Sequence, residues 1–288
     1  MSDSPVARLN ERLASLSELR GKRCLVTGGC GFVGRHIVEQ LLQAGASFVR
    51  VIDLRVTEYN ERVEFVQGDL TNKTDVFNAV AGCDVVFHVA SPSPTHASER
   101  ILMLVNVEGT KLVIEACKEN KATLVCTSSA SVIDDAANTS VCSNADEHTP
   151  APKVCVGAYE KSKLKQEQLV IEAATEEQVM AAVVRPRGIF GPHDPHFFPR
   201  VIETGAKNKT RMMLGDACNL ADFTFVGNVA YGHLLAANAL LAGDKCVNGQ
   251  VFIVTNNEPV PFWDFMARVC RGINVPRPQF NLPYGLMI

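Results

Sequence analysis

Tyr159 and Lys163 are the two residues whose types and spacing most directly indicate chemistry. They lie four positions apart in Tyr-Glu-Lys-Ser-Lys, which places them on one face of a helix. A tyrosine hydroxyl has an ordinary pKa of about 10, so it acts as a base near neutral pH only if its charged form is stabilised. We expect the Lys163 ammonium to lower the pKa of Tyr159 by charge attraction. The pair predicts proton transfer with an alcohol, although this spacing alone usually marks only a helix face.

A run of hydroxyl side chains precedes this pair, at Thr127-Ser128-Ser129-Ala130-Ser131. The run begins where an apolar, buried type of strand ends. We expect Ser129 to hold the oxygen of a substrate in line with the tyrosine hydroxyl. A hydroxyl-rich strand end strengthens the signal of the Tyr-x-x-x-Lys pair considerably.

A glycine-rich loop follows the first expected strand and leads straight into a helix. Gly28 permits a tight turn, Gly31 lets the backbone approach a pyrophosphate, and Gly34 permits close helix packing. Phe32 and Val33 in this loop are expected among the cofactor-binding residues, and the N-terminus of the following helix offers free N–H groups and a positive dipole end that attract phosphate. The loop therefore predicts dinucleotide binding, against the alternative of a merely structural turn.

Asp53 ends the second expected strand, about 20 residues beyond the glycine loop. A carboxylate there accepts hydrogen bonds from both hydroxyls of the adenosine ribose and repels a 2′-phosphate, so NAD is favoured over NADP. Arg55 weakens this inference because its guanidinium could reach a 2′-phosphate, although a solvated surface charge is the more ordinary role. The positive nicotinamide of bound NAD would also favour the tyrosinate form of Tyr159.

Small or polar residues follow the next two strands and trace the same ligand path. Asp69 and Leu70 stand where a turn could contact the adenine, and small residues after the fourth strand would let the cofactor lie against the backbone. Those small residues are Val89, Ala90 and Ser91. Each signal is weak alone, because turns after strands are often small and polar.

The elements that must position these residues alternate regularly along the chain. Short β-branched runs predict buried strands, and longer amphipathic stretches between them predict helices. The strands are expected at 23–27, 49–53, 64–67, 84–89, 123–127, 181–184 and 250–254, and the helices at 34–43, 102–117, 159–173, 226–241 and 262–270. This rhythm predicts an α/β fold with a doubly wound parallel sheet, of the Rossmann type.

The domain organisation follows from the same pattern. We expect an N-terminal amphipathic helix over 1–20, an NAD-binding Rossmann domain over 21–190, and a smaller substrate-binding subdomain over 191–288 that is interleaved with it. The N-terminal helix either docks on the domain or binds a membrane surface or a partner. From the apolar run Leu286-Met287-Ile288 we expect a truncated chain end, with a membrane anchor beyond it.

Composition limits the classes of partner. Of the 288 residues, 47% are hydrophobic and 20% charged, with a net charge of −3, which argues against nucleic-acid binding. The ten cysteines form no Cys-x-x-Cys motif and indicate reduced thiols. His193 and His196 are interpreted as loop residues, and no metal site is expected.

The motifs together resemble the extended short-chain dehydrogenase/reductase family, over nearly the whole chain. Within it, the 3β-hydroxysteroid dehydrogenase branch is most similar, and there the sterol-4α-carboxylate 3-dehydrogenase (decarboxylating) group. Four segments carry the narrower likeness, TSSASV from Thr127, RPRGIFGPHDP from Arg185, DFTFVGNVAYGHLLAA from Asp222 and NNEPVPFW from Asn256.

The resemblance implies roles for particular residues. Tyr159 would be the general base, Lys163 its activator and a ribose ligand, and Ser129 the partner of the substrate hydroxyl. Thr127 would join the cofactor ligands, and Pro186 and Ile189 would line the nicotinamide. It also implies a homodimer paired through the helices at 102–117 and 159–173, a hydrophobic segment after Leu282-Pro283-Tyr284, and work at the cytosolic face of the endoplasmic reticulum membrane or on lipid droplets.

The resemblance further implies oxidation of the 3β-hydroxyl of a 4α-carboxysterol by NAD, followed by loss of carbon dioxide to give a 3-ketosterol. Ala221 departs from the pattern of related nucleotide-sugar enzymes, which carry a phosphate-binding arginine there; with Phe197, Phe198 and Phe225 it predicts an apolar substrate. Three arginines could orient the carboxylate, namely Arg187, Arg200 and Arg211. The alternatives are a 3β-hydroxysteroid dehydrogenase/isomerase, another NAD-dependent alcohol dehydrogenase, and a non-catalytic NAD(H)-sensing protein.

Overall fold

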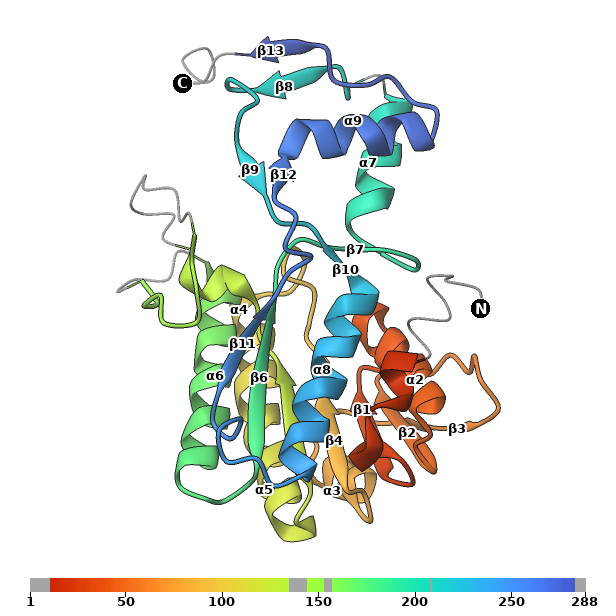
Figure 1. Cartoon of the computed structure of the whole chain (residues 1–288), viewed down its shortest axis with the longest axis vertical. Helices are drawn as coiled ribbons and strands as arrows, with labels where there is room; N and C mark the ends of the chain where they lie inside the picture. Colours follow the sequence, from red (N-terminus) through yellow and green to blue (C-terminus); the bar gives the residue numbers. More distant parts are fainter. Residues whose placement is uncertain (1–10, 135–143, 153–156, 208, 283–288) are drawn as a thin grey trace. The chain divides into compact units, whose positions relative to one another are not determined.

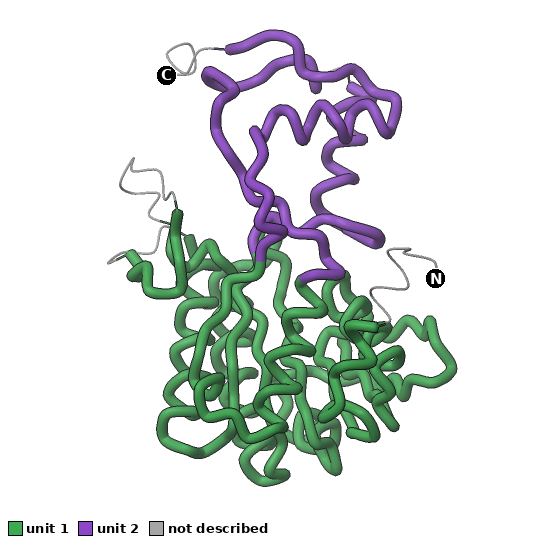
Figure 2. The backbone as a smooth tube through the Cα atoms, in the orientation of Figure 1, with its two compact units in different colours: residues 1–186, 229–254 green, residues 187–228, 255–288 purple. Residues whose placement is uncertain are grey.

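The computed structural model describes residues 11–134, 144–152, 157–207 and 209–282, which form two compact units (Figure 2). Unit 1 comprises residues 1–186 and 229–254, and unit 2 comprises residues 187–228 and 255–288. Three segments named in the sequence analysis lie at least partly outside the described residues. They are the expected N-terminal helix before residue 11, part of the loop after the active-site strand, and the Pro283-Tyr284 element with the apolar chain end.

Unit 1 is built on a seven-stranded sheet with the order β11-β6-β5-β4-β1-β2-β3 (Figure 1). Every pair in it is parallel, which confirms the predicted doubly wound sheet. The strands are β1 (Arg23–Thr27), β2 (Phe48–Asp53), β3 (Val63–Gln67), β4 (Val85–His88), β5 (Thr123–Thr127), β6 (Ala181–Pro186) and β11 (Val251–Val254). The strand order reverses between β1 and β4, and ligands bind beyond the carboxyl ends of strands at such a point.

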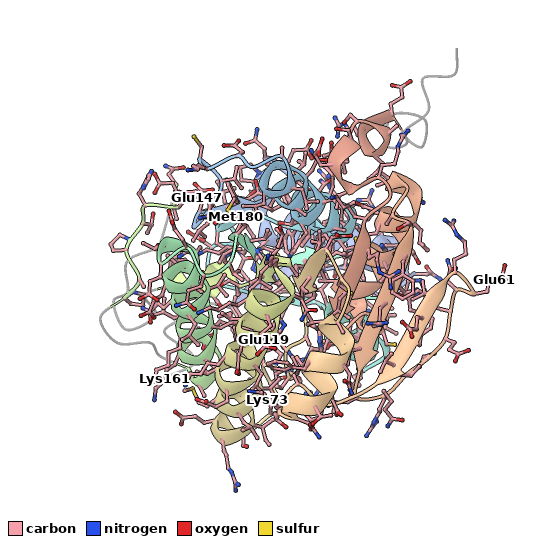
Figure 3. All side chains as sticks on the ribbon, turned by 90° about the horizontal axis from the view of Figure 1, so that it is seen from below. Glu61, Lys73, Glu119, Glu147, Lys161 and Met180 are labelled. Carbon is pink, nitrogen blue, oxygen red and sulfur yellow. The ribbon has the colours of Figure 1, made fainter. Side chains whose placement is uncertain are left out.

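Helices cover both faces of this sheet because successive strand residues point to opposite sides. On β1, Cys24 and Val26 belong to the core under α2 (Phe32–Ala44) and α8 (Val226–Leu241). Leu25 belongs to the opposite core, under α3 (Lys73–Val80), α5 (Thr110–Asn120) and α6 (Ala158–Thr175). Figure 3 shows Lys73, Glu119 and Lys161 on the outer sides of these last three helices.

The chain does not divide into the two units at a single boundary near residue 190. Both α8 from Val229 onward and β11, expected in the smaller subdomain, belong to unit 1. The reason is pairing: β11 extends the sheet beside β6, with Val251 opposite Val183, and α8 buries Leu234 and Ala237 in the core on its face of the sheet.

The expected single helix over the first twenty residues is wrong for the described part. Residues 11–14 are helical, and a separate short turn, η1 (Ser17–Leu19), follows. Leu13, Leu16 and Leu19 are nonetheless buried in the core with α2 and α8. The apolar periodicity therefore reflects docking of this segment on the domain. Docking is the first of the two alternatives that the sequence left open for the N-terminal helix.

The helix predicted over 102–117 is interrupted. The structure has α4 (Glu99–Met103), then a π-helical turn η2 (Leu104–Gly109), then α5. In the π turn, Asn106 is fully buried and its Nδ2 donates to Ser162 Oγ on α6 at 3.0 Å. π turns inside helices often accompany functional sites, and this one lies against α6, which carries Tyr159 and Lys163.

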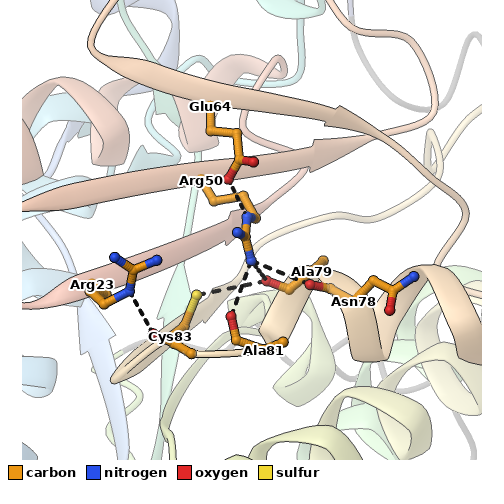
Figure 4. A network of polar contacts seen from close by, with 8 residues as sticks. Arg23, Arg50, Glu64, Asn78, Ala79, Ala81 and Cys83 are labelled. Atoms are coloured by element: carbon orange, nitrogen blue, oxygen red, sulfur yellow. Dashed lines mark hydrogen bonds and ion pairs between the residues drawn. The ribbon is translucent and has the colours of Figure 1, made fainter.

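Arg50 on β2 holds the end of α3 (Figure 4). Its Nη1 donates to the backbone oxygens of Asn78, Ala79 and Ala81, and its Nε pairs with Glu64 on β3. The last carbonyls of a helix have no partners within it, so a guanidinium there satisfies them and complements the negative dipole end.

Unit 2 contains two helices among its described residues, α7 (Phe197–Ala206) and α9 (Phe262–Gly272), and three two-stranded sheets. The sheets pair β7 (Ile189–Phe190) with β10 (Thr224–Phe225), β9 (Leu220–Ala221) with β12 (Val260–Pro261), and β8 (Met212–Leu214) with β13 (Phe280–Leu282). Its phenylalanines pack on one another: Phe223 stacks on Phe265 with ring centroids 3.8 Å apart, and Phe197 contacts both. Phe197 therefore contributes to the unit's own packing, besides any contact with a substrate.

Among the residues that the structure describes, no helix combines the length and the apolar character needed to cross a bilayer.

Candidate active site

The glycine loop lies directly against the turn after β4. Gly28 has a φ of +68°, and a Cβ there would stand 2.8 Å from the Cα of Ala90. A Cβ on Gly34 would stand 2.3 Å from the backbone oxygen of Gly28, so only glycine lets α2 start this close to the loop. The two turns that the sequence assigned to a single ligand path are therefore in contact.

The N-terminus of α2 has the features of a phosphate site. Its cap residue is Gly31, which provides no side-chain hydrogen bond, whereas Asn72 and Ser98 cap α3 and α4. The N–H groups of Phe32, Val33 and Gly34 open the helix without a side-chain cap, and a phosphate is the group that such donors and the helix dipole bind. These residues fit a dinucleotide.

Asp53 lies at this loop. Its Oδ2 accepts from the Cys30 N–H at 3.2 Å, and its Oδ1 lies 3.5 Å from the Arg55 nitrogen. The carboxylate at the end of β2 thus borders the glycine loop, where a ribose hydroxyl would be recognised. Arg55 meets Asp53 through its backbone N–H.

The residues expected to trace the cofactor path have differing environments. Asp69 Oδ1 accepts from both the N–H and the hydroxyl of Thr71, which closes a turn before α3. Leu70 is 7% exposed and belongs to the core. Val89 and Ala90 donate their N–H groups to Thr27 Oγ1 at 3.0 and 3.1 Å, and Ser91 is exposed. The cofactor contacts of these residues remain predictions.

Tyr159 meets Ser129 at the end of β5. Ser129 Oγ lies 2.8 Å from Ser131 Oγ and accepts from the Ser131 N–H at 3.2 Å. Burial raises the pKa of Tyr159 to about 12, and the Ser129 hydrogen bond partly offsets this. The sequence predicted a lowered pKa, and the difference arises because desolvation opposes the phenolate.

Lys163 is 2% exposed and its ammonium is held by two neutral oxygens. Nζ donates to the Thr127 backbone oxygen and to Gln166 Oε1, both at 2.9 Å. Burial lowers the pKa of Lys163 to about 8, so the group is still mainly protonated at neutral pH. A positive charge in the core beside the end of β5 is what a tyrosinate base requires.

Several residues of this site escaped the sequence analysis. Tyr59 donates from its hydroxyl to the Gly29 oxygen at 2.9 Å, and the Arg35 guanidinium lies 4.4 Å from the centre of its ring. His233 on α8 bonds the Thr127 hydroxyl at 2.7 Å. Gln166 could have been found, because it lies three positions after Lys163 on the same helix face.

Other predicted residues are divided between the units. Pro186 ends β6 in unit 1, whereas Ile189 belongs to β7 in unit 2.

Within unit 2, a cavity of about 380 Å³ lies between α7 and α9. It is lined by His196, Phe197, Arg200, Val201, Thr204, Thr210, Phe262 and Met266. Its lining is mainly apolar and includes one of the three candidate arginines.

Metal-binding arrangements of three or more His, Cys, Asp or Glu side chains do not occur in the described part of the chain.

A family model for the 3-beta hydroxysteroid dehydrogenase/isomerase family matches residues 25–284, which include the glycine loop, Tyr159 and Lys163. The chain belongs to this family. The sterol-4-alpha-carboxylate 3-dehydrogenase, decarboxylating, of Bos taurus is 43% identical over 269 residues, covering 93% of this chain and 74% of that protein. The Homo sapiens protein of the same name is 40% identical, covering 98% and 74%.

Solved structures of more distant proteins are also similar to this member of the 3-beta hydroxysteroid dehydrogenase/isomerase family. An epimerase of Methanothermobacter thermautotrophicus superposes with a TM-score of 0.79 at 20% identity, covering 97% of this chain and 84% of that one. At that identity the likeness concerns the fold. It confirms the Rossmann architecture and leaves the substrate to be argued from the site.

Proposed function

We propose that this protein is an NAD-dependent sterol dehydrogenase that oxidises the 3β-hydroxyl of a 4α-carboxysterol, after which carbon dioxide is lost and a 3-ketosterol remains. The observation that carries the proposal is the buried ammonium of Lys163, which donates to the Thr127 oxygen at the end of β5, one helical turn from Tyr159 on α6. Relatives named as decarboxylating sterol-4-alpha-carboxylate dehydrogenases support the choice of substrate.

NAD is held by the glycine loop, the N–H groups that open α2, and Asp53. When bound, it supplies the hydride acceptor and a positive charge near Tyr159. That charge and the Lys163 ammonium together counter the burial that raises the pKa of the hydroxyl. Asp53 favours NAD over NADP because a carboxylate beside the loop repels a 2′-phosphate.

The chain's own residues handle the proton. Ser129 Oγ holds the substrate hydroxyl, and the Tyr159 oxygen removes its proton as C3 is oxidised. The product ketone stands β to the C4 carboxylate, so it accepts the electron pair of the breaking C–C bond, and carbon dioxide leaves without a further cofactor. Ala221 and the apolar cavity of unit 2 suit a sterol better than a nucleotide sugar.

The deciding experiment follows NADH and carbon dioxide with a 4α-carboxysterol, a 3β-hydroxysteroid that lacks the carboxylate, and a UDP-sugar. We expect both products from the first substrate, with carbon dioxide matching NADH. Tyr159→Phe should lower kcat by a factor of about 10² to 10⁴. If only the simple steroid gave NADH, and no carbon dioxide was released, the dehydrogenase/isomerase alternative would be favoured. If no substrate gave NADH, the proposal would be rejected.

We also propose a homodimer that works at the cytosolic face of the endoplasmic reticulum membrane or on lipid droplets. Ile101 and Leu104 are 43% and 39% exposed on α4 and η2, which pack beside α6, a helix expected to pair in the dimer. Sedimentation of the wild type and Ile101→Glu tests the dimer, and the charged variant should be monomeric. Fluorescence microscopy of the full-length protein tests the location.

A further inference from the structure

Six polar side chains lie buried beneath Tyr159 and Lys163, and sequence analysis gave them no role. They come from β1, β4, η2, α5 and α6, and each is at most 1% exposed. They are Thr27, His88, Asn106, Thr110, Ser162 and Gln166. Burying a polar side chain is costly unless it is hydrogen-bonded, and each of the six makes at least one hydrogen bond.

The direction of the first hydrogen bonds follows from counting lone pairs. Thr27 Oγ1 already accepts from the N–H groups of Val89 and Ala90, so its own hydrogen must be donated to His88 Nδ1, 2.9 Å away. Neutral His88 then carries its hydrogen on Nε2. That hydrogen is donated to Thr110 Oγ1 at 2.9 Å.

The same reasoning fixes the orientation of the Gln166 amide. Thr110 donates its hydrogen to the Asn106 backbone oxygen at 2.7 Å, so toward its other neighbours it is an acceptor only. It accepts from Gln166 Nε2 at 3.0 Å, which turns Oε1 toward Lys163 Nζ at 2.9 Å. A flipped amide would place two acceptors, Gln166 Oε1 and Thr110 Oγ1, against each other, and it would place the NH₂ group of Gln166 against the Lys163 ammonium.

The groups around Lys163 leave its charge uncompensated. Burial lowers the pKa of His88 to about 3 and that of His233 to about 4, and it raises the pKa of Cys126 to about 12, so all three are neutral near pH 7. Glu167, one helical turn further along α6, forms a buried bidentate pair with Arg185 on β6. Burial raises the pKa of Tyr159 to about 12, so in this structure the side chain is also neutral near pH 7.

We propose that Gln166 is a positioning residue for Lys163, held by His88 and Thr110 so that a neutral oxygen faces the ammonium. This rests on the proposed role of Lys163 as the activator of Tyr159. A neutral acceptor fixes the place of Nζ without cancelling its charge, and the field of that charge at Tyr159 is preserved. A carboxylate at position 166 would hold Nζ equally well but would remove the net charge.

The direct test measures the titration of Lys163 by NMR in the full chain with ¹³Cε-labelled lysine, the signal being assigned by its loss in Lys163→Met. Gln166→Glu should raise the ratio of ammonium to amine at a given pH about tenfold or more, because an opposite charge favours the ammonium. Gln166→Met keeps the side-chain length but removes the acceptor, and should lower that ratio. Gln40→Met is the matched control, a buried glutamine on α2 at the opposite face of the sheet, and should leave it unchanged.

A ratio that stays within twofold of the wild type in Gln166→Glu would overturn the proposal. If Gln166→Met does not fold, Gln166→Glu still decides, since its side chain has nearly the same shape. A loss of stability without a changed titration would mean that Gln166 is only a structural residue.

The second arm is kinetic. In Gln166→Glu, the rise of kcat/KM with pH during NAD reduction should move to higher pH, because the carboxylate cancels the charge that favours the tyrosinate; in Gln40→Met it should not move. An unmoved rise in Gln166→Glu contradicts the proposal. If the wild type reduces no NAD with any sterol, the proposed function has failed, and the NMR titration alone still tests whether Gln166 controls Lys163.

Discussion

Lys163 donates a hydrogen bond of 2.9 Å from Nζ to the backbone oxygen of Thr127, the last residue of β5. This bond fixes a buried ammonium at the strand end where Ser129 and Tyr159 meet. The strand therefore determines where the charge lies, and the helix determines which hydroxyl is near it. A lysine held in this way has little freedom to leave the site.

The first prediction concerns this lysine. Lys163→Met should lower kcat/KM by a factor of about 10² to 10⁴, since Tyr159 would lose the charge that favours its base form. Lys161→Met is the control, because Lys161 lies two residues away on the same helix but is exposed and forms an ion pair with Glu99 at 2.9 Å. Steady-state kinetics of NAD reduction should show the control within about twofold of the wild type. Equal losses in both variants would contradict the assignment.

The second prediction concerns cofactor choice. Asp53→Ser should weaken NAD binding about tenfold or more and improve NADP binding, because the variant removes the carboxylate that faces the ribose hydroxyls. Binding can be measured by titration calorimetry with each cofactor. Glu61→Ala removes an exposed carboxylate on the loop before β3 (Figure 3) and should change neither affinity. An unchanged NAD affinity in Asp53→Ser would place the ribose elsewhere.

The third prediction separates backbone strain from close packing. Gly28 and Gly243 have φ values of +68° and +77°, but only at Gly28 would a Cβ meet other atoms, the nearest being Ala90 Cα at 2.8 Å. Gly243→Ala should cost about 1 kcal/mol of unfolding free energy from strain alone. Gly28→Ala should cost about 3 kcal/mol or more and abolish NAD binding. Urea unfolding of both variants measures the difference, and similar losses would show that the contact with Ala90 is unimportant.

The fourth prediction concerns acid stability. His233 donates from Nδ1 to the Val229 oxygen at 2.8 Å and accepts the Thr127 hydroxyl hydrogen at Nε2, so it is buried in its neutral form. Burial lowers the pKa of His233 to about 4, below the ordinary value of 6.5. The unfolded chain thus takes up this proton first, and stability that is present above pH 6.5 is lost as the pH falls toward 4.

We expect His233 to contribute a loss on the order of 1 to 3 kcal/mol over that range. The pH dependence of the unfolding free energy between pH 7 and pH 5 should therefore be weaker in His233→Gln than in the wild type. His148→Gln replaces an exposed histidine and should retain the wild-type dependence. A His233→Gln slope equal to that of the wild type would mean that another group governs acid stability.

Much of the fold could be predicted because the signals are local. The short β-branched runs that form β1 to β6 and β11, and the helical periods between them, require only neighbouring residues to be recognised. The interruption of the helix around Asn106 has no local signal in the sequence, and the hydrogen-bond partner of the buried Asn106 side chain, Ser162, lies 56 positions away. Likewise β11 joins unit 1 through the pairing of Val251 with Val183, and α8 joins it by burying Leu234 in the core, and no local pattern encodes either contact.

The candidate site shows the same division. The sequence by itself determined the glycine loop, Asp53, Ser129 and the Tyr159–Lys163 pair, because each is a residue type at a fixed spacing from an element end. Only the tertiary structure decided the charge states, because desolvation and hydrogen bonding depend on what packs around a group. Burial raises the pKa of Tyr159, and Gln166, oriented through Thr110 by His88, faces Lys163 with a neutral oxygen.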